Sequence, residues 1–352
     1  MPARQLGVGV IGCGGIANGA HLPNYVRNPR VKVVAVADVD RERARNTAER
    51  WHVDAYYEDY RELLARDDVE AVSVTTPVFA HAEPALAAMR AGKHVLCEKP
   101  IARTLAEADA MVDAARQAGV LFTMGYQSRF SRLWENTKRI LDEGAIGQMM
   151  AMNVVSTGRA ALPQPWFLDK DLAGGGVLMD WGIYTAYMFN WLAGPVSAVQ
   201  AVTRAFRHEY TAAGKMIHDV KVEDTGVATL EFASGAVGVW YSTWAGLAGH
   251  GYTSIDGTEG SFVMRSADEG GSLVFTSKSS DPDYLQGWRK LPFRELPLAD
   301  QHYRKLDHLV AAVLDGTPLV MTGADGRDAL ELIQAMYLSA ETGQRVRLPL
   351  PR

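Results

Sequence analysis

Several features that would mark other classes of protein are scarce in this sequence. It has two cysteines, Cys13 and Cys97, without metal-ligand spacing, so we predict neither a metal site nor a disulfide framework. The formal net charge is −5 and no basic tract occurs, which argues against nucleic acid as a partner. No apolar stretch is as long as a membrane span. Strand-like sequence begins almost at once, so we expect no signal peptide and a cytoplasmic location.

The composition that remains is that of an ordinary globular protein. The chain has 352 residues, of which 47% are hydrophobic and 22% are charged. A chain of this length and composition can bury a sizeable core. It suggests two domains, or one large domain with an elaborated half.

The stretch Val8–Ala17 begins as a short apolar run and ends in a glycine-rich turn. Gly12, Gly14 and Ala17 lie at G-x-G-x-x-G/A spacing, which suits a tight turn, a close approach by a pyrophosphate and the packing of a helix on a strand. The amides at the start of that helix would face the phosphates. An ordinary glycine-rich turn is the alternative. The position of the motif between a strand and a probable helix favours dinucleotide binding.

Strand and helix patterns alternate from residue 6 to about residue 125. β-branched, apolar runs are typical of buried parallel strands, and the amphipathic or alanine-rich stretches between them predict helices. The expected strands after the first are Val31–Ala37, Val69–Thr75, Lys93–Cys97 and Val120–Met124, and the expected helices are Arg41–Trp51, Glu62–Ala65, Ala80–Ala91 and Leu105–Ala118. This order predicts an α/β Rossmann domain, a doubly wound parallel sheet that binds its ligand at the carboxyl ends of the strands.

The pattern changes after residue 126, and we place a domain boundary there, between residues 1–126 and 127–352. Helices are expected at about Ser131–Glu143, Val177–Leu192, Gln301–Leu314 and Ala324–Ala340, and strands at Met149–Thr157, Val196–Arg207, Val222–Phe232, Ala236–Trp244, Tyr252–Ile255, Gly260–Met264 and Leu273–Thr276. Neighbouring strands with short connections predict a large, mostly antiparallel sheet in an α+β domain.

Asp38 ends the second expected strand. A carboxylate there would accept the two ribose hydroxyls of an adenosine and would repel a 2′-phosphate, which favours NAD as the cofactor. Arg41 and Arg43 follow closely and could bind that phosphate, so NADP is the alternative. A structural alternative is that Asp38 caps the next helix.

Polar residues also follow the strands Val69–Thr75 and Lys93–Cys97, at the edge where the cofactor is expected. His81 stands at a probable helix start, where a structural role or a lid over the cofactor is more common than catalysis. Lys99 lies between a buried strand and Pro100, and its ammonium would stabilise the oxyanion of a reacting hydroxyl. A solvated surface lysine is the alternative. A cis peptide before Pro100 would help to aim Lys99.

A second group of candidate residues follows the glycines at positions 174–176. Asp180 and Tyr184 are four residues apart on the expected helix and share one face, with Tyr187 three residues further on. The alternative is a satisfied Asp–Tyr pair in the core. The glycines, however, would let a ligand approach closely, and a tyrosine hydroxyl held by a lysine is a workable acid and base near neutral pH.

The stretches GVGVIGCGGIA, AVAD, TTP, GKHVLCEKP and AGGGVLMDWGIY together resemble the glucose–fructose oxidoreductase, inositol dehydrogenase and rhizopine catabolism (Gfo/Idh/MocA) family. The similarity covers nearly the whole chain. It implies a Rossmann domain, an α/β domain whose open sheet often forms the oligomer interface, a nicotinamide cofactor, and pyranose or polyol substrates. We therefore expect a homodimer or homotetramer formed through the C-terminal sheet.

Many family members carry a lysine in EKP and a D-x-G-x-H-x-x-D motif. Lys99 and Asp180 match these positions, whereas Tyr184 and Tyr187 replace the histidine and the second aspartate. In this respect the chain resembles the branch of glucose–fructose oxidoreductase, xylose dehydrogenase and dihydrodiol dehydrogenase, in which a tyrosine is the acid/base.

The resemblance assigns roles to individual residues. Tyr184 would remove the proton of the reacting hydroxyl, Lys99 would stabilise the phenolate, and Asp180 would orient the substrate or Lys99. Arg129, in GYQSRF, and Trp166 would join Lys99, Asp180 and Tyr184 in substrate binding. The expected cofactor-binding residues are Gly12, Gly14, Gly15, Ile16, Asp38, Thr75, Thr76, Pro77, His81, Glu98 and Lys99.

The function predicted on this basis is hydride transfer between a nicotinamide cofactor and a hydroxyl or keto carbon of a sugar or related cyclic polyol. Two alternatives share the fold. One is a glycosidase that uses tightly held NAD for transient oxidation. The other is a sugar- or NAD-sensing protein without turnover, like the galactose regulon repressor, although a sensor would not need Lys99.

Overall fold

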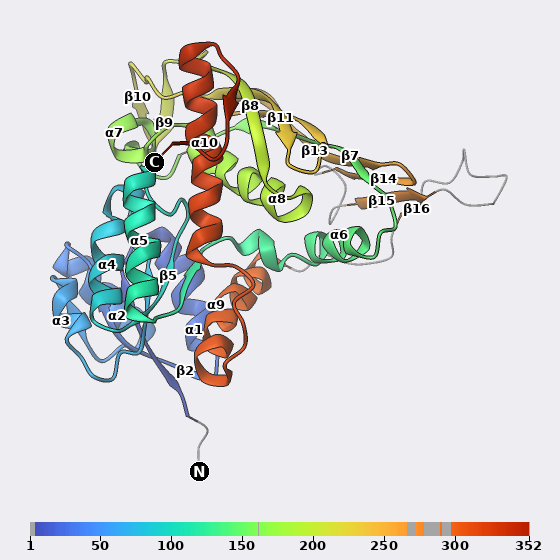
Figure 1. Ribbon diagram of the computed structural model, residues 1–352. Helices are drawn as coiled ribbons and strands as arrows, with labels where there is room; N and C mark the ends of the chain where they lie inside the picture. The colour runs from blue at the N-terminus through green and yellow to red at the C-terminus, as the bar shows by residue number, and fades with distance from the viewer. Residues whose placement is uncertain (1–3, 161, 266–271, 278–288, 291–296, 352) are drawn as a thin grey trace. The chain divides into compact units, whose positions relative to one another are not determined.

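The computed structural model describes residues 4–160, 162–265, 272–277, 289–290 and 297–351 (Figure 1). The chain forms two compact units. The first comprises Met1–Phe130 and Leu296–Arg327, and the second comprises Ser131–Glu295 and Asp328–Arg352. Within the described ranges, every helix is too short or too polar to cross a lipid bilayer.

The first unit is built on a six-stranded parallel sheet in the order β3-β2-β1-β4-β5-β6. Its strands are β1 (Leu6–Ile11), β2 (Val31–Ala37), β3 (Tyr56–Tyr57), β4 (Ala71–Val74), β5 (His94–Cys97) and β6 (Phe122–Met124). The strand order reverses between β1 and β4. In an open parallel sheet this reversal is where ligands bind, outside the carboxyl ends of the strands.

The helices of the first unit cover both faces of this sheet. They are η1 (Ala17–His21), α1 (Leu22–Val26), α2 (Arg41–Trp51), α3 (Tyr60–Leu64), η2 (Val78–Ala80), α4 (Ala82–Arg90), α5 (Leu105–Ala118), η3 (Gln127–Phe130) and α9 (Leu298–Asp315). Helices α4 and α5 lie side by side (Figure 1). Side-chain caps from Asp40, Asp59 and Thr104 fix the starts of α2, α3 and α5.

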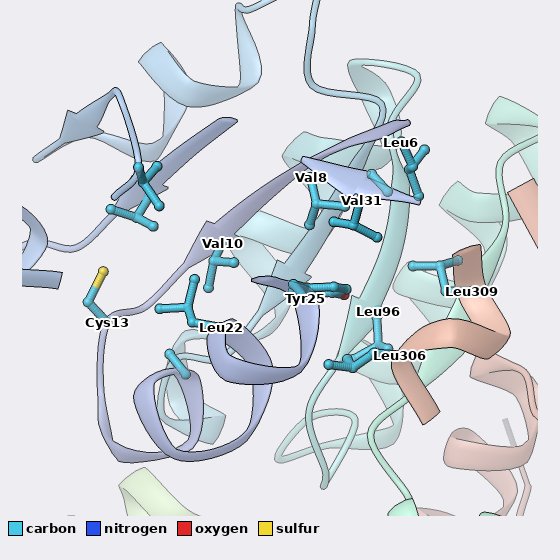
Figure 2. Packing of buried hydrophobic residues seen from close by; sticks show 14 of the residues in the cluster. Leu6, Val8, Val10, Cys13, Leu22, Tyr25, Val31, Leu96, Leu306 and Leu309 are labelled. Atoms are coloured by element: carbon cyan, nitrogen blue, oxygen red, sulfur yellow. The ribbon is translucent and has the colours of Figure 1, made fainter. Parts of the chain in front are cut away.

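The alternation of residues along β1 explains how helices pack on its two faces. Val8 and Val10 are fully buried and face Leu22 and Tyr25 of α1 (Figure 2). On the opposite face, a Cβ at Gly9 would lie only 2.6 Å from the Leu63 Cδ2 atom of α3. Glycine therefore lets α3 approach closely on one face, while the valines build the core on the other.

Helix α9 completes this core from a distant part of the sequence. Its Leu306 and Leu309 are 1% exposed and belong to the same cluster as Val8 and Val10 (Figure 2). The helix contacts α1, η1 and β1. A segment more than 160 residues beyond β6 in the sequence therefore belongs to the first unit.

The second unit contains a nine-stranded sheet in the order β16-β15-β14-β13-β7-β12-β11-β8-β17. The strands are β7 (Met149–Arg159), β8 (Val196–Arg204), β11 (Thr225–Phe232), β12 (Val237–Thr243), β13 (Ala245–Gly257), β14 (Gly260–Arg265), β15 (Ser272–Ser277), β16 (Arg289–Lys290) and β17 (Val346–Arg347). All neighbours are antiparallel except β7 and β12, which run parallel. A separate hairpin joins β9 (Tyr210–Ala212) and β10 (Lys215–Ile217).

The remaining helices belong to this second unit, with α10 shared at its start. They are α6 (Arg132–Asp142), η4 (Pro165–Leu168), α7 (Lys170–Ala173), η5 (Leu178–Gly182), α8 (Ile183–Ala193) and α10 (Gly323–Thr342). Helix α8 buries Phe189, whose ring centroid lies 5.7 Å from that of Trp240 on β12. The helix thus packs directly on the sheet.

The predicted fold class is confirmed: a doubly wound parallel sheet is followed by a large, mostly antiparallel one. Several local expectations need correction. The strand expected at Tyr252–Ile255 is part of the longer β13, and the helix expected at Ala80–Ala91 is split at His81 into η2 and α4. Helix α2 is capped by Asp40, whose side chain accepts the Arg43 amide proton, and not by Asp38.

Candidate active site

The loop that follows β1 is fixed by contacts with the residues that follow β4. Gly12 has a φ of +94°, and a Cβ there would lie 2.7 Å from the Thr76 amide nitrogen. The Thr75 hydroxyl donates to the Gly12 carbonyl oxygen at 2.6 Å. Only glycine satisfies both the backbone angle and this close approach. The predicted tight turn is therefore present, with Thr75 and Thr76 beside it.

Gly14 and Gly15 contrast with Gly12 because the space around them is open. A Cβ built at either residue would have no atom within 4 Å. They start the helix that continues through Ile16, which is 37% exposed, into η1. The first amides of a helix have no partner within the helix. Open space next to such amides is what an anion such as a pyrophosphate requires, so these residues fit a dinucleotide.

Asp38 lies at the end of β2, beside this loop. It is 8% exposed. One carboxylate oxygen accepts the Cys13 amide proton at 2.8 Å, and the other accepts the Asp40 amide proton at 2.9 Å and an Arg43 guanidinium proton at 3.0 Å. Asp38 therefore joins the glycine loop to the start of α2. Its carboxylate stands where an adenosine ribose is expected, and Arg43 is already bonded to it.

The two cysteines are free thiols within the part of the chain that the structure describes, and both are buried. Burial, together with the nearby Asp38 carboxylate, raises the pKa of Cys13 to about 12. Burial also raises the pKa of Cys97 well above its usual range. The thiolate is the reactive form of cysteine, so Cys13 is a small packed residue of the loop.

His81 bridges the segments that follow β4 and β5. Its ring nitrogens lie 2.7 Å from the Pro100 carbonyl oxygen and 2.9 Å from the Thr76 carbonyl oxygen, and the side chain is 1% exposed. Burial lowers the pKa of this histidine. Both ring nitrogens of His81 thus lie against main-chain carbonyl oxygens. Pro77 lies in the same segment and starts η2.

Lys99 follows β5 and is partly buried, and the peptide bond between Lys99 and Pro100 is cis. The preceding Glu98 is 6% exposed, and its Oε1 atom lies 2.8 Å from the His21 Nε2 atom and accepts a hydrogen bond from the Lys305 ammonium at 2.6 Å. Burial alone would raise the pKa of Glu98, but Lys305 and His21 hold it well below its usual range.

His21 and Lys305 were not foreseen as site residues. Each is a single polar residue on an apolar helix face, and hydrogen-bonded core residues without any role in a site occupy such positions too. Their place in the sequence therefore does not indicate a functional site. Arg129 is the last predicted site residue of this unit, and it lies on η3 shortly after β6.

In the second unit, Asp180 on η5 and Tyr184 on α8 occupy one face of a continuous helical stretch. Both are partly exposed, whereas Met179, Ile183 and Tyr187 around them are buried. Neither side chain is therefore fully buried. Tyr187 packs in the interior with its ring stacked on Trp191 at 6.2 Å.

A buried carboxylate holds the start of this helical stretch. Glu223 accepts the amide protons of Gly176 at 2.8 Å and Leu178 at 3.1 Å, and the Tyr337 hydroxyl proton at 2.8 Å. Burial raises the pKa of Glu223 against the opposing effect of these donors. A Cβ at Gly176 would lie 1.9 Å from the Glu223 carbonyl oxygen, which explains the glycine. The sequence did not indicate Glu223, because its partners lie far away in the chain.

Trp166 lies on η4, in the segment that precedes the glycines. Its ring stacks on Phe167 with centroids 3.9 Å apart and an interplanar angle of 22°. Helix α7 follows, capped by Asp169, whose carboxylate accepts the amide protons of Asp171 and Leu172. The second unit therefore displays an aromatic pair, a carboxylate and a tyrosine hydroxyl on η4, η5 and α8.

The first unit has a parallel sheet with a glycine loop at the point where the strand order reverses, and the second unit has a large open sheet. This combination defines a nicotinamide-dependent oxidoreductase of two units. The chain belongs to the Gfo/Idh/MocA oxidoreductase family. The family's NAD-binding Rossmann-fold model matches residues 6–126, and its C-terminal domain model matches residues 134–263.

Relatives align along almost the whole chain. Myo-inositol 2-dehydrogenase of Thermotoga maritima is 29% identical over 342 residues, which are 97% of this chain and 98% of that protein. 1,5-Anhydro-D-fructose reductase of Ensifer adhaerens is 30% identical over 348 residues, with coverage of 97% and 98%. The solved structure of a levoglucosan dehydrogenase in complex with NADH and L-sorbose matches with a TM-score of 0.89 and 27% identity, over 99% of this chain and all of that one.

Proposed function

We propose that this oxidoreductase transfers hydride between a nicotinamide and a secondary hydroxyl or keto carbon of a pyranose or cyclic polyol, with Tyr184 as the acid/base. The observation that carries the proposal is the partial exposure of Asp180 and Tyr184, one turn apart, on a helical stretch whose other residues are mostly buried. A carboxylate and a phenol one turn apart on the same helix face can contact the same ligand.

The residues of this chain would divide the proton chemistry between them. Tyr184 would take the hydroxyl proton as the substrate is oxidised and would return it in the reverse direction. The Lys99 ammonium would favour the phenolate form of Tyr184, since an isolated tyrosine titrates near pH ~10. Asp180 would orient the substrate by accepting hydrogen bonds from it. NAD, when bound, supplies the hydride acceptor, and Gly12, Gly14, Gly15, Asp38 and the residues after β4 and β5 would hold it.

The substrate class follows from the relatives and from the residues near the helix. The levoglucosan and inositol dehydrogenases named above act, by their names, on rings that carry several hydroxyls. Arg129 and the stacked Trp166 would recognise such a ring, because aromatic faces pack on sugar rings and guanidinium groups donate to hydroxyls. We propose NAD as the preferred cofactor, because the Asp38 carboxylate would repel a 2′-phosphate.

Two site variants test this proposal. Tyr184→Phe removes the proton acceptor and keeps the ring, so kcat should fall by on the order of 10²–10⁴ while NAD affinity stays near normal. Lys99→Ala should cost at least as much, and the double variant should cost much less than the two single effects combined. Steady-state kcat across pH and NAD titration by fluorescence quenching supply the data. A Tyr184→Phe enzyme with most of its kcat would refute the assignment.

The two alternative functions differ in their products. A glycosidase with tightly held NAD would hydrolyse a glycoside without net formation of NADH, and a sensor would bind sugar without any product. A dehydrogenase forms NADH in proportion to substrate. A screen of monosaccharides and polyols by NADH fluorescence, with hydrolysis measured in parallel, separates the three and identifies the substrate.

We also propose that the open face of the nine-stranded sheet forms a homo-oligomer interface. Apolar or aromatic side chains follow one another across five strands in register, and three of them are more than 40% exposed. The row consists of Val202, Val227, Tyr241, Val155 and Tyr252 on β8, β11, β12, β7 and β13. Val237 and Val239 on β12 add to the exposed apolar surface of this face. Exposed apolar surface of this kind marks interaction sites.

The reduced state of Cys13 and Cys97 is typical of a cytoplasmic protein. We propose the cytoplasm as its location.

A further inference from the structure

Lys305 on α9 is completely buried in the first unit, which is unusual for a lysine side chain. Its ammonium lies 2.6 Å from the Glu98 Oε1 atom, and this oxygen also lies 2.8 Å from the His21 Nε2 atom. Glu98 directly precedes Lys99, and its second oxygen accepts the Lys99 amide proton at 3.3 Å. A buried ion pair is thus attached to the main chain of the lysine assigned to catalysis.

The hydrogen bonds around this pair allow two tautomers of a neutral His21, and the contact with Glu98 favours one of them. The hydroxyls of Tyr25 and Ser73 are 2.7 Å apart, and Ser73 lies 3.1 Å from the His21 Nδ1 atom. If Tyr25 donates to Ser73 and Ser73 donates to Nδ1, a neutral His21 carries its proton on Nε2 and donates it to Glu98. In the other tautomer, Nε2 would accept from the Lys305 ammonium at 3.2 Å, but its lone pair would face the nearer Glu98 oxygen at 2.8 Å. Glu98 therefore receives two donors on one oxygen.

Space for the carboxylate is kept by a glycine after β6. A Cβ at Gly125 would lie 2.6 Å from both the Cδ and the Oε2 atoms of Glu98. The carboxylate is thus confined between Gly125, His21 and Lys305, and it cannot turn toward solvent.

The charges of the cluster balance at neutral pH. Burial, then repulsion by Lys305, lowers the pKa of His21 to about 4, so this histidine is neutral. His302 on α9 is buried near the same groups, and burial and Lys305 lower its pKa to about 4. Tyr25 and Cys97 also face the cluster and are uncharged, because burial raises the pKa of both well above neutrality. Among the described residues of this cluster, Glu98 and Lys305 form the ion pair.

We propose that Lys305 is a positioning residue for Lys99: it cancels the charge of Glu98, so that this carboxylate does not compete for the Lys99 ammonium at any pH at which the enzyme works. The proposal rests on the proposed function of Lys99. Without Lys305, a proton on His21 is the remaining way to balance Glu98. Lys305→Met should therefore create an ionisation at His21 that the native protein does not have.

The first experiment observes that ionisation without measuring activity. NMR of the full-length protein with ¹³C-labelled histidine should show His21 neutral from pH 5.5 to 8.5 in the wild type. In Lys305→Met its pKa should rise to near neutrality, a shift on the order of two units or more. Lys305→Arg, which keeps the cation, and Glu98→Gln/Lys305→Met, which has no carboxylate to balance, should show no such titration. An unshifted His21 in Lys305→Met would overturn the proposal.

Stability provides a second measurement if Lys305→Met folds poorly at neutral pH. A His21 pKa that is higher in folded Lys305→Met than in the folded double variant stabilises Lys305→Met relative to the double variant at low pH, and this relative stabilisation is lost as the pH rises through the higher value. The urea midpoint of Lys305→Met, relative to that of the double variant, should therefore fall between pH 5.5 and 8. An unfolding equilibrium with no pH dependence beyond that of the double variant contradicts the proposal.

The third measurement connects the cluster to Lys99. Above the new pKa of His21, Glu98 is unbalanced and attracts the Lys99 ammonium. The kcat of Lys305→Met, divided by that of the double variant at each pH, should then fall on the order of tenfold from pH 6 to 8.5. A purely structural ion pair would lower stability but leave this ratio flat, and a flat ratio refutes the proposal. Failure of Tyr184 as the acid/base is seen separately, in the Tyr184→Phe enzyme, and does not alter the His21 titration.

Discussion

The carboxylate of Glu223 accepts the Gly176 amide proton at 2.8 Å and thereby holds the start of the helical stretch that carries Asp180 and Tyr184. Its other oxygen serves both the Leu178 amide and the Tyr337 hydroxyl. All of these contacts are made within the second unit. The position of the proposed acid/base therefore depends on a residue that lies about forty positions away in the sequence.

Replacement of Glu223 should affect both stability and catalysis. Glu223→Gln keeps the shape but sets an NH₂ group against one of the donors, so it should lower the free energy of unfolding by ~1–3 kcal/mol. The kcat should fall while NAD affinity is retained. Tyr337→Phe is the matched control, since it removes one donor and should cost only ~0.5–1.5 kcal/mol. Urea denaturation gives both values. Equal costs for the two variants would contradict the assigned role.

Asp38 and Arg43 should together determine cofactor preference. The wild type should have a higher kcat/KM with NAD than with NADP. Asp38→Ser removes the carboxylate and frees Arg43, which should raise the NADP/NAD ratio of kcat/KM by about 10- to 100-fold, the value of one charged contact. Arg43→Ala added to Asp38→Ser should abolish most of that gain. A wild type that prefers NADP, or a gain that survives loss of Arg43, would show this interpretation to be wrong.

Buried histidines should make the protein sensitive to acid. Burial lowers the pKa of His21, His302 and His308 to about 4, below the unfolded value near ~6.5. The unfolded chain therefore binds more protons between these values, and stability present above pH ~6.5 is lost as the pH falls toward 4. Each histidine contributes a slope of up to ~1.4 kcal/mol per pH unit.

Urea denaturation from pH 5 to 7 tests this effect in a range above the titration of most carboxylates. His302→Asn should reduce the slope of stability against pH. His218 is exposed and paired with Glu209 at 2.8 Å, so His218→Asn is a suitable control. Wild-type stability that does not change between pH 5 and 7 would contradict the prediction.

A charge in the middle of the open sheet face should weaken self-association. Val239 on β12 is 46% exposed, and Val26 on α1, in the other unit, is 53% exposed. Val239→Glu should weaken the oligomer by at least about tenfold, because a buried unpaired charge is costly. Val26→Glu is the control and should leave the mass of the oligomer in solution unchanged. Sedimentation velocity over a range of concentrations decides, and an unaltered oligomer of Val239→Glu would exclude this face as the interface.

Local patterns were sufficient for part of the molecule. The strand–glycine–helix order around Gly12, the acidic end of β2 at Asp38 and the apolar strands of the first sheet can all be recognised within short windows of sequence. The helix ends marked by Gly92 and Gly119 could be predicted for the same reason, since both adopt left-handed backbone angles.

Other features depend on contacts between distant residues. Nothing near Lys305 or Glu223 in the sequence shows that one faces Glu98 and the other caps η5. The parallel pairing of β7 with β12, two strands about eighty residues apart, likewise cannot be predicted from the sequence. The alternation of apolar and polar residues shows which face of a strand is buried, but it does not show which strand lies beside it. The periodicity of α9 predicts a buried face, yet it cannot indicate which of the two units covers that face.

The return of α9 to the first unit has a consequence for biosynthesis. A chain that emerges from the ribosome has its six parallel strands after 124 residues, but it lacks Lys305 beside Glu98 and the leucines that cover Val8 and Val10. At ordinary elongation rates the intervening residues 131 to 295 take on the order of 10–30 s to synthesise. Until then the nucleotide-binding unit lacks the lysine that pairs with Glu98 and the leucines that cover its apolar cluster, so it completes its fold only when translation is nearly finished.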